Sequence, residues 1–549
     1  MNVFELRQRL VDDYKNYTKS FIHISDPRVS EKVERALDAG DFWPEPLLQL
    51  NPTFAPGGTI DALVSDGTLH PECSKIFRMG KSASNPDGHP LQLHAHQTEA
   101  ITKAKEGKSY VLTSGTGSGK SLTYIVPIVD HVLRRGPGKG IQAIVVYPMN
   151  ALANSQNEEL GKFLLQGYTE GESPVRFARF TGQEKTPERD SIRNNPPDIL
   201  LTNYMMLELL LTRGEDRALV KAASGLRFLV FDELHTYRGR QGADIALLIR
   251  RCRLALDAHN LICVGTSATM ASGGSLNDQK ASVAEVAETL FGAPVTPSQV
   301  IGETLNRATP ELDFSKGEIG GKLTEAVTSF TSAPEDYESF RTNPLSSWIE
   351  STFGVMTEET GALVRKPPRR LRGPDGASEE LAKLTQAAPE RCYEILCEML
   401  QRGSALRKDS SSRYPIFAFR LHQFFTRGDT VWSTLEPEDI RHLEMAKLGS
   451  KPGEPDKPLF PLVFCRQCGT AYYRVSVVED ENGSLVIPRE DHREDGVEGG
   501  KDAYLYISAK SPWPETDGPA LLDRLPDHMK ETTPGGVERV RPDNRADVP

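Results

Sequence analysis

The residues with the clearest capacity for chemistry are the eight from Ser114 to Ser121, Ser-Gly-Thr-Gly-Ser-Gly-Lys-Ser. Glycines let backbone N–H groups turn toward phosphate oxygens, and a helix N-terminus behind them favours negative charge. A lysine neutralises β- and γ-phosphates, and a hydroxyl binds Mg²⁺. A Gly-rich turn that only begins a helix is the alternative, and Ser114 stands where the strict pattern has glycine. We therefore predict a nucleotide-phosphate site made by Thr116, Gly117, Ser118, Gly119, Lys120 and Ser121.

A pair of carboxylates, Asp232 and Glu233, follows the apolar run RFLVF. Charges at the end of a buried strand are costly unless the site uses them. With a phosphate loop nearby, Asp232 would hold Mg²⁺ together with Ser121, and Glu233 would polarise an attacking water. The alternative is that the two carboxylates cap the next helix.

The elements that must position these residues are five short apolar runs separated by helical patterns. Such runs are typical of a parallel sheet covered by helices on both faces. They predict an α/β, doubly wound lobe over residues 91–290. The runs are SYVLTS (109–114), AIVVYP (143–148), DILLTN (198–203), RFLVFD (227–232) and LICVGTS (261–267).

The remainder of the chain divides into four further segments. Residues 1–90 begin as an amphipathic helix and continue as a Pro/Gly-rich linker. Residues 291–460 are expected to be a mainly helical insert. Residues 461–510 predict a β-hairpin, formed by AYYRVSVV and LVIP around EDENGS. Residues 511–549 form a tail without convincing periodicity.

The order and spacing of the motifs resemble the first RecA-like lobe of superfamily 2 DEAD/DEAH-type helicases, over residues 91–272. A third motif, Ser267-Ala268-Thr269, contributes to this resemblance by its position. The resemblance implies that ATP and Mg²⁺ bind here, and that Gln97, in Leu93–Gln97, contacts the adenine edge. It further implies that a second group of residues contacts the nucleic-acid backbone or couples it to the nucleotide state. That group is Pro148, Asn150, Gly182, Thr202, Asn203, Ser267 and Thr269.

A narrower resemblance begins at the acidic pair. The segment from Asp232 to Asp244 and the following IALLIRRCRLAL are similar to a bacterial subgroup of large multidomain DNA helicases linked to DNA repair and phage defence. Residues 417–432 and 464–475 resemble inserted regions of the same subgroup. The subgroup implies DNA, rather than RNA, as the partner.

A cysteine pair, Cys465 and Cys468, has the spacing and following glycine of a zinc knuckle. Its place before a hairpin predicts a half zinc-ribbon-like segment. Tetrahedral zinc needs four ligands, and no second Cys-x-x-Cys pair follows before Pro549. Zn²⁺ at this pair is therefore a hypothesis that requires ligands from elsewhere.

One departure from the helicase pattern concerns the second RecA-like lobe, which supplies arginine fingers. No Gln-x-x-Gly-Arg-x-Gly-Arg-like segment occurs from residue 291 to 549. We expect the N-terminal, ATP-binding half of a motor, as a truncated product or as a subunit whose second lobe lies on another chain. A non-hydrolysing assembly scaffold and a phosphate-loop ATPase that does not act on nucleic acid are the alternatives.

Composition sets broad limits on the class of protein. The chain has 549 residues, of which 38% are hydrophobic and 26% charged, as in a globular protein. Its first residues lack the basic start and apolar core of a secretion signal, no uninterrupted apolar stretch of 18 residues occurs, and its seven scattered cysteines suit a reducing compartment. We expect a cytoplasmic protein. The net charge of −11 leaves nucleic-acid binding open, because a motor contacts phosphates along a narrow track.

Overall fold

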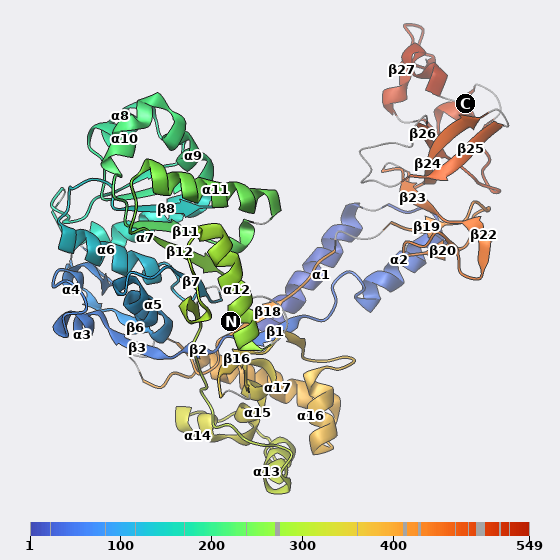
Figure 1. Cartoon of the computed structure of the whole chain (residues 1–549). Coiled ribbons are helices and arrows are strands. Elements are labelled where there is room, and N and C mark those ends of the chain that lie inside the picture. The colour runs from blue at the N-terminus through green and yellow to red at the C-terminus, as the bar shows by residue number, and fades with distance from the viewer. Residues whose placement is uncertain are drawn as a thin grey trace. The chain divides into compact units, whose positions relative to one another are not determined.

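The computed structural model forms two compact units (Figure 1), which we call the sheet unit and the mixed unit. The sheet unit contains Pro52–Ala308 and Val355–Arg365, and the mixed unit contains Met1–Asn51, Thr309–Gly354 and Lys366–Pro549. The residues that the structure describes are 2–21, 23–82, 84–115, 117–169, 171–237, 239–268, 275–358, 361–409, 414–426, 430–466, 468–480, 483–489, 500–514, 518–525 and 527–547.

The sheet unit is built on a seven-stranded parallel sheet with the strand order β13-β7-β12-β11-β8-β10-β9. All five predicted strands are present, and the α/β prediction is confirmed. Its strands are β7 (Tyr110–Thr113), β8 (Ala143–Tyr147), β9 (Phe177–Phe180), β10 (Ile199–Asn203), β11 (Phe228–Phe231), β12 (Ile262–Ser267) and β13 (Val300–Gly302).

Helices cover both faces of this sheet. Successive residues of each strand point to opposite faces, so each strand contributes side chains to two hydrophobic cores. In β8, Ala143, Val145 and Tyr147 belong to one hydrophobic core, whereas Ile144 and Val146 belong to the other. The first core includes residues of α5 (Ala95–Lys105), α6 (Leu122–Arg135) and α7 (Asn150–Leu164). The second includes residues of α9 (Tyr204–Thr212), α10 (Arg217–Ala222), α11 (Gly239–Ala255) and α12 (Leu276–Phe291).

Small elements complete the sheet unit. An antiparallel hairpin, β15–β16, belongs to it although residues 309–354 of the mixed unit precede it in the chain. The remaining elements of this unit are β2 (Thr53–Phe54), β3 (Pro56–Thr59), α3 (Ile60–Ser65), α4 (Cys73–Ile76), β4 (Arg78–Met79), β5 (His89–Pro90), β6 (Gln92–His94), α8 (Thr186–Asn194), β14 (Leu305–Asn306), β15 (Val355–Thr357) and β16 (Leu363–Arg365).

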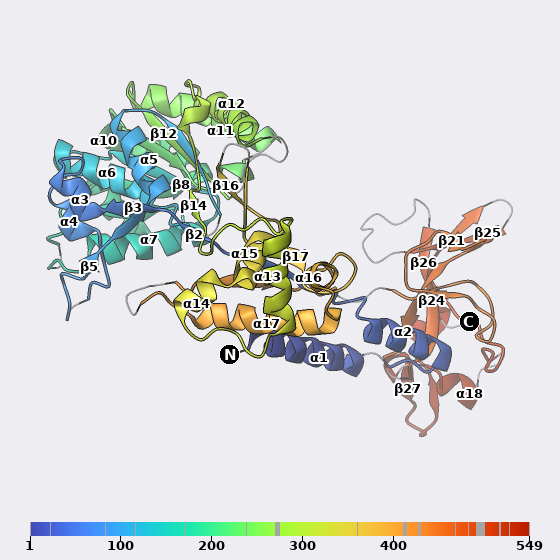
Figure 2. The ribbon, with the colours of Figure 1, turned by 90° about the horizontal axis from the view of Figure 1, so that it is seen from below.

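The mixed unit contains most of the predicted helical insert. Helices α13 to α17 lie together in one group (Figure 2), and α16 and α17 pack closely against each other. The helices of the unit are α1 (Val3–Phe21), α2 (Pro27–Ala39), α13 (Gly317–Thr328), α14 (Tyr337–Thr342), α15 (Pro344–Phe353), α16 (Ala377–Thr385), α17 (Pro389–Ala405) and α18 (Pro519–Leu522).

The strands of the mixed unit are antiparallel and join distant parts of the chain. In one sheet, β1 lies between β17 and β18. In another, β24 pairs with β25 as the predicted hairpin. The strands are β1 (Leu47–Leu50), β17 (Arg369–Arg370), β18 (Phe419–His422), β19 (Trp432–Ser433), β20 (Leu443–Glu444), β21 (Ser450–Lys451), β22 (Glu454–Pro458), β23 (Phe460–Phe464), β24 (Ala471–Asp480), β25 (Gly483–Pro488), β26 (Gly500–Leu505), β27 (Lys530–Thr532) and β28 (Glu538–Val540).

Three structural findings bear on the sequence analysis. Strand β13 lies beyond residue 290, where the predicted lobe ended, and joins the edge of its sheet next to β7. Within the described residues, the seven-stranded sheet is the one parallel sheet, so a second RecA-like lobe is not found there. None of the helices in the described ranges is long and apolar enough to cross a membrane.

Candidate functional site

The predicted phosphate loop connects β7 to α6 at the carboxyl end of the sheet strands. Gly117 and Gly119 have φ values of 83° and 70°, a left-handed conformation that other residues rarely adopt. The hydroxyl groups of Ser114 and Ser118 lie 2.7 Å apart and hydrogen-bond across the loop. Thr116 lies outside the described residues. The glycines thus stand where the backbone requires them.

The start of α5 holds the helix-side half of the loop. The Gln97 amide donates to the Gly119 carbonyl at 3.0 Å, and its oxygen accepts the His94 backbone N–H at 2.8 Å. His96 Nε2 lies 3.0 Å from the Ser118 carbonyl oxygen. Burial lowers the pKa of His96, against the opposing effects of the Ser118 carbonyl and the Glu303 charge. The structure therefore places Gln97 against the loop, and its contact with adenine stays a prediction.

The charge at the centre of the site is a pair formed by Lys120 and Glu233. Lys120 Nζ lies 3.0 Å from Glu233 Oε1, and both side chains are mostly buried. Glu233 has φ 53° and ψ 54°, an uncommon conformation for a residue other than glycine. Its backbone N–H donates to Thr266 Oγ1 at 3.1 Å. This turn at the end of β11 directs the carboxylate toward the loop lysine.

Asp232 lies beside this pair and has its own partner on β12. The Thr266 hydroxyl donates to Asp232 Oδ1 at 2.5 Å. Burial raises the pKa of Asp232, as does the Glu233 charge, while the Thr266 hydrogen bond and the Lys120 charge oppose the shift. The half-buried Asp232 carboxylate and the Ser121 hydroxyl are oxygen donors of the kind that Mg²⁺ prefers, with phosphates and water as its other ligands. The residues present therefore fit a magnesium ion.

The end of β12 connects the acidic pair to the loop. The Ser267 hydroxyl lies 3.2 Å from His235 Nδ1, and the Ser267 carbonyl accepts the Ser114 backbone N–H at 3.1 Å. His235 Nδ1 also lies 3.3 Å from Glu233 Oε2. Thr269 lies outside the described residues. One chain of polar contacts thus runs from the acidic residues to the phosphate loop.

Three of the residues assigned to backbone contacts meet at the ends of β8, β9 and β10. The Asn203 side chain donates to Asn150 Oδ1 at 2.7 Å and to the Thr181 carbonyl at 3.1 Å. Gly182 has φ 91°, and its N–H donates to the Glu184 carboxylate at 2.9 Å. Glu184 is a residue that the motifs did not single out. Pro148 directly follows β8, two residues before Asn150.

Thr202 differs from these residues because its side chain is fully buried. Its hydroxyl donates to the Phe180 carbonyl at 2.7 Å, across neighbouring strands of the sheet. In this conformation Thr202 stabilises the pairing of β10 with β9 and offers no surface to a ligand. In the sequence, the signal for this burial was the apolar run Ile-Leu-Leu directly before Thr202, within DILLT, which predicts a buried strand.

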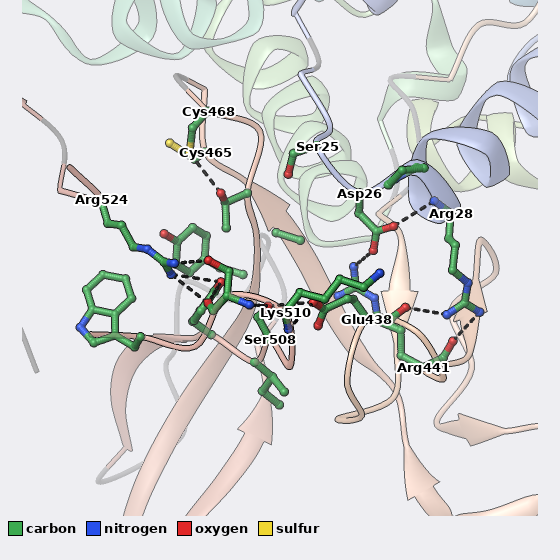
Figure 3. A pocket seen from close by; sticks show the side chains of 18 of the residues that line it. Ser25, Asp26, Arg28, Glu438, Arg441, Cys465, Cys468, Ser508, Lys510 and Arg524 are labelled. Carbon is green, nitrogen blue, oxygen red and sulfur yellow. Dashed lines mark hydrogen bonds and ion pairs between the residues drawn. The ribbon is translucent and has the colours of Figure 1, made fainter. Parts of the chain in front are cut away.

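The cysteine pair lies in the mixed unit, in the turn between β23 and β24 (Figure 3). The Gly469 N–H donates to the Cys465 carbonyl at 2.8 Å, and Cys468 Sγ lies 3.2 Å from Thr470 Oγ1. Both cysteines line a cavity of about 700 Å³. Across the described ranges, no group of three or more His, Cys, Asp or Glu side chains could hold a metal ion. The zinc hypothesis thus gains no further ligand.

Comparison with known proteins identifies the domain that contains the phosphate loop. The DEAD/DEAH box helicase family matches residues 94–275. The chain carries a DEAD/DEAH box helicase domain. This domain spans the loop, the acidic pair and Ser267, so the resemblance to superfamily 2 helicases is confirmed.

Similarity to individual proteins extends beyond this helicase domain. Druantia protein DruE of Escherichia coli is 23% identical in an alignment that covers 60% of this chain and 24% of that protein. The uncharacterized ATP-dependent helicase YprA of Bacillus subtilis is 30% identical over 34% of this chain and 24% of its own length. The chain thus spans about a quarter of these relatives. A solved structure of the DUF1998 helicase MrfA bound to DNA and AMPPNP is similar over 55% of this chain and 39% of that chain, at 20% identity and a TM-score of 0.36.

Proposed function

We propose that this chain is the ATP-binding part of a DNA helicase or translocase. The observation that carries the proposal is the meeting of Lys120 with Glu233, 3.0 Å apart, beside the phosphate loop. ATP would enter this ion pair with its β- and γ-phosphates on Lys120, which releases the Glu233 carboxylate to orient a water molecule. Magnesium held by Ser121 and Asp232 would neutralise phosphate charge.

DNA is the proposed partner, contacted by hydroxyl, amide and backbone groups around Pro148, Asn150, Gly182, Asn203 and Ser267. Such contacts hold a strand by its phosphates without reading its sequence. The similarity to a helicase family supports a nucleic-acid substrate. The subgroup resemblance of residues 232–244 favours DNA over RNA.

Hydrolysis is proposed to need a second RecA-like lobe, supplied by another chain or another segment. An arginine finger from such a lobe contributes about 10³–10⁵ in turnover in related phosphoryl-transfer sites. This chain alone should therefore bind ATP and hydrolyse it slowly. A non-hydrolysing scaffold and an ATPase that ignores nucleic acid are the alternatives that an experiment must separate.

The test is MgATP binding and turnover by the purified chain, with and without single-stranded DNA, beside Lys120→Ala. Lys221→Ala, an exposed lysine of α10, serves as the matched control. We expect Lys120→Ala to abolish binding and the control to retain it. Binding that survives in Lys120→Ala contradicts the assigned phosphate site. Turnover that is indifferent to DNA when a second lobe is present favours an ATPase unrelated to nucleic acid. A complex with a partner chain that forms equally well with Lys120→Ala favours a scaffold.

A further inference from the structure

The strand-side end of the phosphate loop is held by residues outside the motifs described above and outside the matched helicase domain, residues 94–275. Glu303 follows β13 directly, and its Oε2 accepts the Gly115 backbone N–H at 3.3 Å. The Arg365 guanidinium donates to both oxygens of the same carboxylate, through Nε to Oε1 and through Nη2 to Oε2 at 3.1 Å. The side chains of Arg365 and Glu303 are 20% and 16% exposed. This arrangement is a shielded, two-pronged ion pair with the loop amide as a third member.

The hairpin β15–β16 fixes the position of Arg365. Arg365 is the last residue of β16 and pairs with Val355 across the hairpin. Its guanidinium lies 5.5 Å from the centre of the Phe54 ring, and Phe54 packs against the His94 and His96 rings at 4.9 and 5.2 Å. The planar guanidinium group is rigid, and its contact with an aromatic ring restricts it further. Arg365 therefore loses little conformational entropy when it makes its hydrogen bonds to Glu303.

The loop is therefore anchored at both ends. His96 and Gln97 hold the carbonyl groups of Ser118 and Gly119, and Glu303 holds the N–H of Gly115. A shielded ion pair contributes little by itself, because desolvation opposes its attraction. Here the carboxylate also satisfies a backbone donor, so the pair fixes the path of the loop. A cavity of about 620 Å³ lies beside this anchor, lined in part by Ser114, Gly115, Glu303 and Arg365.

We propose that Glu303 and Arg365 are positioning residues for the nucleotide: they hold Gly115 so that the later amides of the loop keep the geometry that phosphates require. This inference rests on the proposed function of the loop. It adds that nucleotide affinity depends on two residues outside the motifs. Displacement of the hairpin would then lower nucleotide affinity without any change in Lys120, Asp232 or Glu233. Charge-assisted hydrogen bonds of this kind change binding by about tenfold or more.

The experiment measures the dissociation constant for MgATP and the melting temperature of the nucleotide-free chain. The variants are Arg365→Met, Glu303→Ala, and the exchanged pair Glu303→Arg with Arg365→Glu. Arg370→Met is the matched control, because Arg370 is an exposed arginine five positions later. The exchanged pair restores opposite charges but removes the acceptor for the Gly115 N–H. A purely structural ion pair is rescued by this exchange, whereas an anchor for the loop is not.

We expect the two single variants and the exchanged pair each to weaken MgATP binding by about tenfold, with Arg370→Met unchanged. Unchanged binding in Arg365→Met and Glu303→Ala, or full rescue in the exchanged pair, overturns the proposal. So does tighter binding, which would make Glu303 an inhibitor that competes with phosphate. If a variant melts at a markedly lower temperature, Arg365→Lys, which keeps the charge and loses the fork, replaces it and must still weaken binding. Failure of the proposed function is distinct, since Lys120→Ala would then bind MgATP as well as the unmodified chain.

Discussion

The phosphate loop and the cysteine pair both begin as short sequence motifs, but the structure completes only the first. Around the loop, side chains from α5, from the end of β11 and from β12 contact one another or the loop, although α5 and β12 are more than 150 residues apart in the sequence. Around Cys465 and Cys468, the turn is well formed, yet within the described residues no third metal-binding side chain joins them. A short motif supports a functional assignment when other helices and strands place interacting side chains around it. A local turn alone does not provide such side chains.

The largest expected effect that tests the assigned role of the phosphate-loop site is that of Glu233→Gln. The substitution keeps the shape of the side chain and removes the charge that would orient water, so MgATP binding should persist. Turnover, measured with a second lobe present, should fall by about 100-fold or more. Equal turnover of Glu233→Gln and the unmodified chain would show that Glu233 is not the water-activating residue and that its pairing with Lys120 is structural.

Thr266→Val tests whether the partner on β12 matters to the same site. Loss of the hydroxyl removes the hydrogen bond to Asp232 and the acceptor for the Glu233 N–H. We expect MgATP affinity to fall by about tenfold. Thr102→Val, at an exposed position of α5, is the control. Equal affinity in Thr266→Val and the control contradicts the role given to Thr266.

A third prediction concerns His131, on the helix α6 that follows the loop. Burial, together with the charges of Arg227 and Arg135, lowers the pKa of His131 on α6 to about 4. Because the unfolded histidine titrates near its ordinary value of about 6.5, the unfolded state gains the proton first. Stability should therefore fall as the pH falls from about 6.5 to about 4.

The measurement is the melting temperature at pH 7 and pH 5 for the unmodified chain and for His131→Leu. We expect the unmodified chain to lose roughly 2–4 °C more than His131→Leu over this interval. His259→Asn serves as control, because the His259 side chain is 84% exposed. Parallel losses in all three proteins would rule out the contribution of His131.

The smallest expected effect belongs to the cysteine pair. The described residues offer two cysteine side chains and no third ligand, so Cys465→Ser with Cys468→Ser should leave the metal content and the melting temperature unchanged. Metal analysis of the purified chain, before and after chelation, checks this. Stoichiometric zinc that disappears in the double variant would contradict it and would restore the zinc-ribbon hypothesis.

The sequence predicted the parts of the site that lie on apolar strands. The runs before Ser114 and Asp232 are fully buried strands, and their continuous apolar character made them visible. Strands β9 and β13 were missed, because FARF is mostly half-buried and VIG has only three residues. Such short edge strands form when neighbours offer hydrogen bonds, a condition that local sequence does not carry.

The partners of the site were harder to predict than its central residues. Thr266 lies within a predicted strand, but only the parallel pairing of β12 with β11 brings its hydroxyl to Asp232. Glu303 and Arg365 are separated by a segment that belongs to the other unit. Their contact depends on chain topology, and neither residue has a local pattern that distinguishes it from a solvated charge.

The position of β1 between β17 and β18 has a consequence for the time course of synthesis. Leu48 and Leu50 of β1 are buried in the finished protein, but the strand that pairs with all four residues of β1 ends at His422. At a synthesis rate of about 5–20 residues per second, β1 is synthesised roughly 20–75 s before β18 is complete. During this interval its leucines lack their final neighbours, so β1 can complete its packing only after the chain has been extended to His422.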